Sequence, residues 1–196
     1  MADSATQISN PVRQITKDEV YDAVAPTDFG AMLAIDRHMN RSTAFDKIIS
    51  ATHDHFWDPL DKKYIDFNDD FSADTTDFIP DELVPALMTD YVSNFFADKP
   101  AERIRFKSQT GRWVMSSILH GEQGAMSLSA SLCQIMRDPG AQEYAANQTR
   151  EEARHVTAFS RYIQIRFGTP LEAGPTLAGL MSGLVSSPYV YQKLVG

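Results

Sequence analysis

Two stretches of the chain carry apolar positions at helical spacing with clear start and stop positions. The first runs from about Ala101 to Met136, after Lys99-Pro100, and the second from Pro139 to about Phe167. Proline is favoured in the first turn of a helix, and Gly168-Thr169-Pro170 ends the second stretch. The break between them is Arg137-Asp138-Pro139-Gly140. We predict two long helices that run antiparallel if the chain folds back at this break.

Shorter elements flank this pair. A helix is predicted from Thr27 or Asp28, a good N-cap, to about Ser50, and another from about Pro80 to Phe96. Weaker helical segments follow from about 175 to 185 and from near Pro188. The apolar stripe of the first helix would comprise Met32, Ile35, Met39, Phe45, Ile48 and Ile49. No strand pattern is present, so the sequence indicates an all-α antiparallel bundle over residues 27–196, preceded by an arm over residues 1–26.

Composition narrows the class of protein. The 196 residues suit one domain, and 43% hydrophobic with 22% charged residues is typical of a soluble globular protein. A net charge of −8 argues against nucleic-acid and anionic-membrane partners, which require a basic face. Cys133 is the only cysteine, which excludes an internal disulfide, and neither a secretory segment nor a membrane-spanning run is visible. These features predict a cytoplasmic protein.

Glu122 and the pair Glu152–His155 carry the candidate chemistry. Glu122 is about sixteen residues from the break on one side, and Glu152 and His155 are about fifteen on the other. At ~1.5 Å rise per residue all three lie roughly 20–25 Å from the turn. Glu152 and His155 are spaced i, i+3 and therefore share a helix face. We predict that one carboxylate faces a carboxylate-imidazole pair on the opposing helix, a ligand set suited to iron, manganese or zinc.

The surroundings of Glu122 favour an inward orientation. Gly121 and Gly124 cost about 1 kcal/mol each inside a helix relative to alanine, which suggests close helix approach or room for something bound. A carboxylate on an apolar stripe is costly unless it is paired or bound to metal. The alternative is that Glu152 joins its charged neighbours in a solvated, salt-bridged face. Those neighbours are Arg150, Glu151 and Arg154.

On these residues the sequence resembles the ferritin-like superfamily, and within it the carboxylate-bridged di-iron oxygenases. This group includes bacterial multicomponent monooxygenase hydroxylases and the ribonucleotide reductase small subunit. The resemblance covers residues 101–167 and rests on Glu122 in His-Gly-Glu-Gln-Gly-Ala and on Glu-Glu-Ala-Arg-His. It implies that Glu122 is a terminal iron ligand, that Glu152 bridges two irons, and that His155 completes the first iron's protein ligands.

The chain departs from the pattern because it holds no second Glu-x-x-His, and Glu172 is the only acid after His155. We expect either the N-terminal part of a longer polypeptide, the preferred hypothesis, or a homodimer in which each chain donates half a site.

The resemblance implies a non-haem di-iron oxidoreductase that activates O₂ and oxidises a small organic substrate, with an external electron donor. The alternatives are a ferritin-like protein that oxidises Fe²⁺, served by a half-site homodimer, and a metal-free helical scaffold.

Four further features have mostly structural interpretations. His53-Asp54-His55, with Asp58 and Asp61, could bind a second metal, but its tight spacing favours a capping loop with Trp57 packed at a core edge. Trp57 and Tyr64 could alternatively carry electrons to a di-iron centre. Cys133 is read as a small buried hydrophobe. The acidic run over residues 66–82 is read as a solvated loop.

Overall fold

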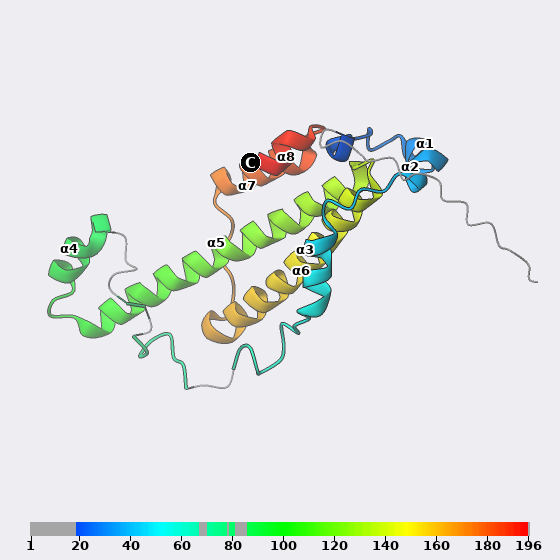
Figure 1. The fold of residues 1–196 in the computed structure, drawn as a ribbon. Coiled ribbons are helices and arrows are strands. Elements are labelled where there is room, and N and C mark those ends of the chain that lie inside the picture. Colours follow the sequence, from blue (N-terminus) through cyan, green and yellow to red (C-terminus); the bar gives the residue numbers. More distant parts are fainter. Residues whose placement is uncertain (1–18, 67–69, 78, 81–85, 196) are drawn as a thin grey trace, which may run out of the picture.

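The computed structural model describes residues 19–66, 70–77, 79–80 and 86–195 (Figure 1). Within these residues the chain forms helices and no β-strand, apart from one isolated backbone bridge between Ala23 and Met136. The all-α prediction is therefore confirmed for the described part of the chain.

The centre of the fold is a hairpin of two long helices, α5 (Pro100–Ile135) and α6 (Pro139–Phe167). Each begins with proline in its first turn, where the missing N–H costs nothing. The chain leaves α6 at Gly168, whose φ of +83° is accessible to glycine at little cost. The predicted first and last residues of both helices agree with the observed ones to within one residue.

Contacts along the hairpin prove that α5 and α6 are antiparallel. Near the turn the Gln142 side chain donates a hydrogen bond to the Cys133 carbonyl, and at the far end Arg112 donates to the Thr169 carbonyl. Between these ends Glu122 faces His155. Figure 1 shows α5 continuing well past the end of α6, where it meets α4 (Ala86–Phe95).

The turn between the two helices is fixed by Asp138, which is 5% exposed. One carboxylate oxygen accepts from the Ala141 N–H and caps α6, and the other accepts from the Ser42 N–H at 2.8 Å. Gly140 lies against the same segment, and a Cβ there would collide with the Ser42 carbonyl oxygen. The turn is thus tied to a segment almost a hundred residues earlier.

The C-terminal helices return along the other side of α5 (Figure 1). Helix α7 (Pro175–Ser186) packs against α5 where Met181 meets Gly124. Helix α8 (Val190–Val195) contributes Val190 to a small core at the turn end. The other buried members of this core are Val20, Ile135, Met136 and Ala141. Val20 lies in the short 3₁₀ helix η1 (Glu19–Tyr21), so the end of the predicted arm is packed against the hairpin.

The prediction of one helix from residue 27 to residue 50 is wrong. The structure has three short helices instead, α1 (Phe29–Met32), α2 (Ile35–Met39) and α3 (Asp46–Asp54). Asp28 caps α1 as expected, with its side chain accepting from the Ala31 N–H. The predicted stripe is buried only in part, because Met32 and Ile49 are 7% and 4% exposed whereas Ile35 and Met39 are 80% and 61% exposed.

Tertiary contacts explain why the longer helix does not form. Arg37 turns inward, where its Nε donates to the Arg137 carbonyl at 2.7 Å. Ser42 lies against the α5–α6 turn, where its N–H donates to Asp138. These bonds to the hairpin offset the loss of helical hydrogen bonds between residues 40 and 45.

The acidic connection also departs from a purely solvated loop where it is described. Asp77 forms an ion pair with Lys107, whose side chain is 4% exposed, and Asp74 lies 3.5 Å from Arg105. The predicted helix from Pro80 to Phe96 is observed as α4 from Ala86, while residues 81–85 lie outside the described residues.

No described helix combines the length and the apolar character needed to cross a membrane.

Candidate metal centre

Glu122, Glu152 and His155 converge between α5 and α6. The Nδ1 atom of His155 lies 3.1 Å from Oε2 of Glu122 and 3.0 Å from Oε2 of Glu152. Glu152 and His155 are one turn apart on α6, and the antiparallel pairing brings Glu122 to the same height on α5. One ligand atom from each of the three side chains lies within 4.8 Å of the others. The predicted meeting of these side chains is confirmed.

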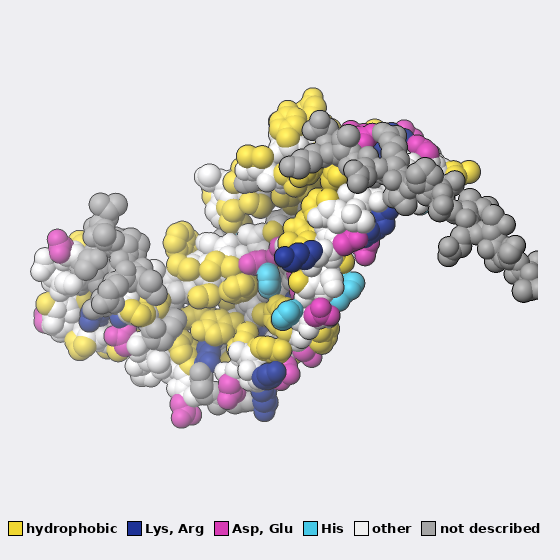
Figure 2. Space-filling model, in the orientation of Figure 1, with side chains coloured by type: hydrophobic (Ala, Val, Ile, Leu, Met, Phe, Trp, Pro, Cys, Tyr) yellow, Lys and Arg dark blue, Asp and Glu magenta, His cyan; other side chains and the backbone are white. Residues whose placement is uncertain are grey.

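The cluster is buried on one side and open on the other. The side chain of Glu152 is 11% exposed, that of Glu122 is 22% exposed and that of His155 is 40% exposed. Gln148, one turn before Glu152, donates a 2.5 Å hydrogen bond to Oε1 of Glu152. Both oxygens of Glu152 therefore have polar neighbours, while His155 borders solvent. In Figure 2 the visible histidine side chains gather where α3 and α6 lie.

The three ionisable groups shift one another's protonation. Burial lowers the pKa of His155, but its hydrogen bonds with Glu152 and Glu122 outweigh this effect and the pKa lies above its ordinary value. Burial, together with the contact to Glu152, raises the pKa of Glu122. Burial also acts to raise the pKa of Glu152, yet its hydrogen bonds with Glu122, Gln148 and His155 lower it overall. The cluster favours positive charge at its centre.

The geometry of the donor set fits a metal ion. Protein nitrogen and oxygen ligands bind Zn²⁺ and similar ions at about 2.0–2.2 Å, so two ligands at right angles lie about 3 Å apart. The separations of 3.1 and 3.0 Å around Nδ1 have this size. Two carboxylates and one imidazole suit iron, manganese or zinc. A divalent ion would replace the proton that otherwise joins the imidazole to the carboxylates.

The two glycines beside Glu122 have different roles. A Cβ at Gly124 would collide with the Met181 side chain, so this glycine permits close approach of α7 to α5. A Cβ at Gly121 would meet nothing within 4 Å. Close packing on one side and free space on the other correspond to the two interpretations that the sequence allowed.

The salt-bridged face proposed as the alternative also exists, but it excludes Glu152. Glu151 accepts from Arg154 at 2.8 Å and from Arg150 at 3.0 Å. Glu152 points to the other side of α6, toward Glu122 and His155. Consecutive glutamates therefore have separate environments, Glu151 in ion pairs with Arg150 and Arg154 and Glu152 in the cluster.

The contacts that Gln148 and Trp57 make with the cluster were not predicted from the sequence. Gln148 precedes Glu152 by four residues, and this i, i+4 spacing could have indicated the hydrogen bond. Trp57 stacks on the His155 ring with a centroid distance of 5.7 Å and an interplanar angle of 30°. Tyr64 packs edge-on against Trp57. No periodic pattern could place these aromatics, because they belong to an irregular connection. Electron transfer through them stays a prediction.

The His53-Asp54-His55 segment has the capping geometry that was favoured. His53 and Asp54 are the last residues of α3, and the His55 Nδ1 lies 2.8 Å from the Ala51 carbonyl oxygen. Among the described residues, no second group of three or more histidine, cysteine or acidic side chains has metal-ligand spacing. Cys133 is half-buried, and burial raises the pKa of its thiol, which disfavours the nucleophilic thiolate.

Trp57 should hold the His155 ring in its ligand orientation. We expect Trp57→Ala to weaken divalent-metal binding about tenfold, the lower end of the range for outer-shell partners of metal ligands. Trp57→Phe should retain most of the affinity because it keeps an aromatic face. Phe56→Leu is the matched control, since Phe56 lies under Arg154 rather than His155. Titration with Zn²⁺ against a competing chelator measures the dissociation constants, and equal affinities for Trp57→Ala and Phe56→Leu would refute the role.

Compared with protein families, curated proteins and solved structures, the chain matches none. The resemblance to the ferritin-like superfamily therefore stays a prediction that rests on the three residues and their convergence.

Proposed function

We propose that this protein is a non-haem iron oxidoreductase that uses O₂ to oxidise a small organic substrate, with Glu122, Glu152 and His155 as iron ligands. The observation that carries the proposal is the approach of the His155 Nδ1 to within 3.1 Å of both carboxylates. Two carboxylates this close on facing helices are costly to bury unless a cation lies between them, and a bound metal ion would take this role in place of the proton on His155.

The ligand count indicates one half of a dinuclear site. A carboxylate-bridged di-iron bundle takes a glutamate from each of two helices and Glu-x-x-His from each of the other two. Glu122 and Glu152–His155 supply one glutamate and one Glu-x-x-His. The other half would come from outside the described residues. Iron is the preferred ion for redox chemistry, whereas manganese and zinc suit the same donors.

Each residue of the cluster would have a separate role. Glu152, the most buried, has one oxygen toward His155 and the other held by Gln148, which suits a carboxylate that bridges two positions. Glu122 would bind as a terminal carboxylate from α5, and His155 would bind through Nδ1. Iron bound there would supply the redox couple for O₂ activation, with electrons from an external donor.

The exposure of His155 supports a second candidate function. A ligand whose side chain is 40% exposed leaves a path for aqueous Fe²⁺ to enter and leave. A ferritin-like protein that oxidises Fe²⁺ for storage or detoxification would need such access, and a homodimer could complete its site.

Metal analysis and O₂ consumption test these proposals together. The purified protein should bind at least about half an equivalent of Fe, Mn or Zn; less would refute both metal-binding functions, by the stoichiometry of a shared site. For an oxygenase, O₂ uptake by the iron-loaded protein should require both an electron donor and an organic substrate. Uptake that depends on added Fe²⁺ alone would favour iron oxidation instead.

A further inference from the structure

Residues 56–65 form an irregular loop, the strap, which follows α3 and passes over the cluster. The ring of Trp57 stacks on the ring of His155 with a centroid distance of 5.7 Å. The centroid of the Phe56 ring lies 4.6 Å from Cζ of Arg154, the residue before His155. Two consecutive aromatic side chains of the strap thus cover two consecutive residues of α6.

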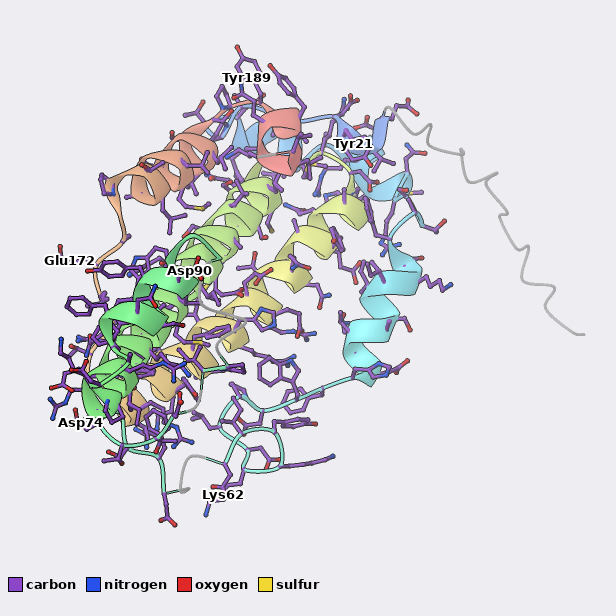
Figure 3. The ribbon with its side chains drawn as sticks, turned by 90° about the vertical axis from the view of Figure 1, so that its left-hand side faces the viewer. Tyr21, Lys62, Asp74, Asp90, Glu172 and Tyr189 are labelled. Atoms are coloured by element: carbon purple, nitrogen blue, oxygen red, sulfur yellow. The ribbon has the colours of Figure 1, made fainter. Side chains whose placement is uncertain are left out.

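The strap is attached to α6 only weakly. None of its residues is buried, and Figure 3 shows Lys62 at its outer end, away from the helices. Its backbone hydrogen bonds are internal, since the Asp61 N–H donates to the Asp58 carbonyl and the Tyr64 N–H donates to the Asp61 carbonyl. Within the described part of the chain, no hydrogen bond joins the strap to α6. Segments with few buried contacts open at a low cost in free energy.

Both ends of the strap are fixed. At one end α3 stops at Asp54, and the His55 Nδ1 lies 2.8 Å from the Ala51 carbonyl oxygen. At the other end the Asp66 carbonyl oxygen accepts a 3.4 Å hydrogen bond from Arg166, which is 9% exposed. The strap can therefore swing away from α6 between two fixed points, without the unfolding of a helix.

Trp57 covers the open side of the cluster. The side chain of His155 is 40% exposed. A cavity of about 460 Å³ extends from the cluster toward the α5–α6 turn, and it is lined by Glu152 but not by His155. The exposed surface of His155 thus lies outside this cavity, and the Trp57 ring lies against the imidazole there.

Metal binding would strengthen the contact between Trp57 and His155. The imidazole gains positive charge when its Nδ1 binds a divalent ion, and the face of an indole ring attracts cations. The plane of the imidazole would also be fixed, because the ion ties Nδ1 to the carboxylates of Glu122 and Glu152. A ligand shifts an equilibrium between two positions only through such a difference in affinity, and here the difference favours the closed strap.

We propose that the strap is a metal-dependent cover of the site. It swings away from α6 often in the metal-free protein, and it stays closed when Glu122, Glu152 and His155 hold a divalent ion. Closure keeps water away from the His155 side of the bound ion. The inference rests on the proposed function in one respect, which is that these three side chains bind metal. It requires neither O₂ nor an organic substrate.

Limited proteolysis of the whole protein measures how often the strap opens. Lys62 and Lys63 are exposed and offer trypsin two cleavage positions in the strap. Saturating Zn²⁺ should slow cleavage there about three- to tenfold, the range for one partly desolvated cation–π contact, because cleavage follows the open population. A short lysine-containing peptide in the same tube corrects for any effect of zinc on trypsin. Unchanged cleavage of a protein that has bound zinc would overturn the proposal.

Variants separate the cover from a general effect of metal on stability. At zinc concentrations that saturate each variant, Trp57→Ala should lose the protection and Trp57→Phe should keep most of it. Phe56→Leu should be cleaved faster but still be slowed by zinc by the wild-type factor, because Phe56 contacts Arg154 and no metal ligand. Trp113→Phe, at an exposed position of α5, should match the wild type. Wild-type protection in Trp57→Ala would refute the cover.

Fluorescence gives a second measure of closure. Trp57 and Trp113 are the only tryptophans of the chain, so Trp113→Phe leaves Trp57 as the sole emitter. Acrylamide quenches exposed tryptophans more strongly than covered ones, and bound zinc should therefore lower the quenching of Trp57. Equal quenching with and without bound zinc would contradict the closure.

Zinc content measured on the same samples separates the two proposals. Bound zinc with unchanged cleavage and unchanged quenching would refute the cover and leave the metal site intact. Less than about half an equivalent of bound zinc would refute the metal site and, with it, the cover.

Discussion

Glu152→Ala and His155→Ala should each reduce the bound metal to background. Each variant removes one of three ligands from this chain and leaves two, and loss of a direct ligand costs more than the 10–100-fold associated with an outer-shell partner. Glu122→Gln should have a similar effect, because an amide oxygen binds iron or zinc more weakly than a carboxylate does. Elemental analysis after gel filtration in metal-loaded and chelator-treated samples measures the result.

Glu151→Ala is the matched control for these variants. It removes a glutamate adjacent to Glu152 on the same helix, and it disrupts only the ion pairs with Arg150 and Arg154. Metal content should stay at the wild-type value in Glu151→Ala. Wild-type stoichiometry in Glu152→Ala or His155→Ala, with helical content intact by circular dichroism, would show that the metal binds elsewhere.

The hairpin could be predicted because the residues that begin and end its two helices lie at the helix ends themselves and can be recognised in the sequence. Proline at the start of α5 and of α6, glycine after α6 and a capping Asp138 mark the ends of the two helices. Once both lengths and the turn are set, the rise per residue puts Glu122 opposite Glu152 and His155. The candidate site could be predicted from the same rise per residue, because Glu122, Glu152 and His155 all lie on regular helices.

The segment before the hairpin could not be predicted in the same way. Its apolar positions fit one helix, but hydrogen bonds to residues about a hundred positions later break it into three. The spacing of apolar residues along a segment gives no information on hydrogen-bond partners so far away in the sequence. Trp57 was recognised as an aromatic of interest, yet its place over His155 depends on the path of an irregular connection. The cavity beside Glu152 likewise arises only when α8 folds back over the hairpin.

Asp138 joins the turn of the hairpin to the segment that precedes it. Asp138 holds two backbone N–H groups with two different oxygens, at the N-terminus of α6 and at Ser42. Removal of the carboxylate would leave both donors without this acceptor, in a place where water has little access.

Asp138→Ala should therefore destabilise the protein by about 2–4 kcal/mol, from loss of a helix cap and of a second buried acceptor. Asp138→Asn keeps one carbonyl oxygen and should cost about half as much. The control is Asp28→Ala, which removes a cap from the exposed four-residue α1 and should cost about 0.5 kcal/mol. Urea unfolding followed by circular dichroism gives the free energies. Equal effects of Asp138→Ala and Asp28→Ala would mean that Asp138 acts only as a helix cap and that its bond to Ser42 adds nothing to the stability.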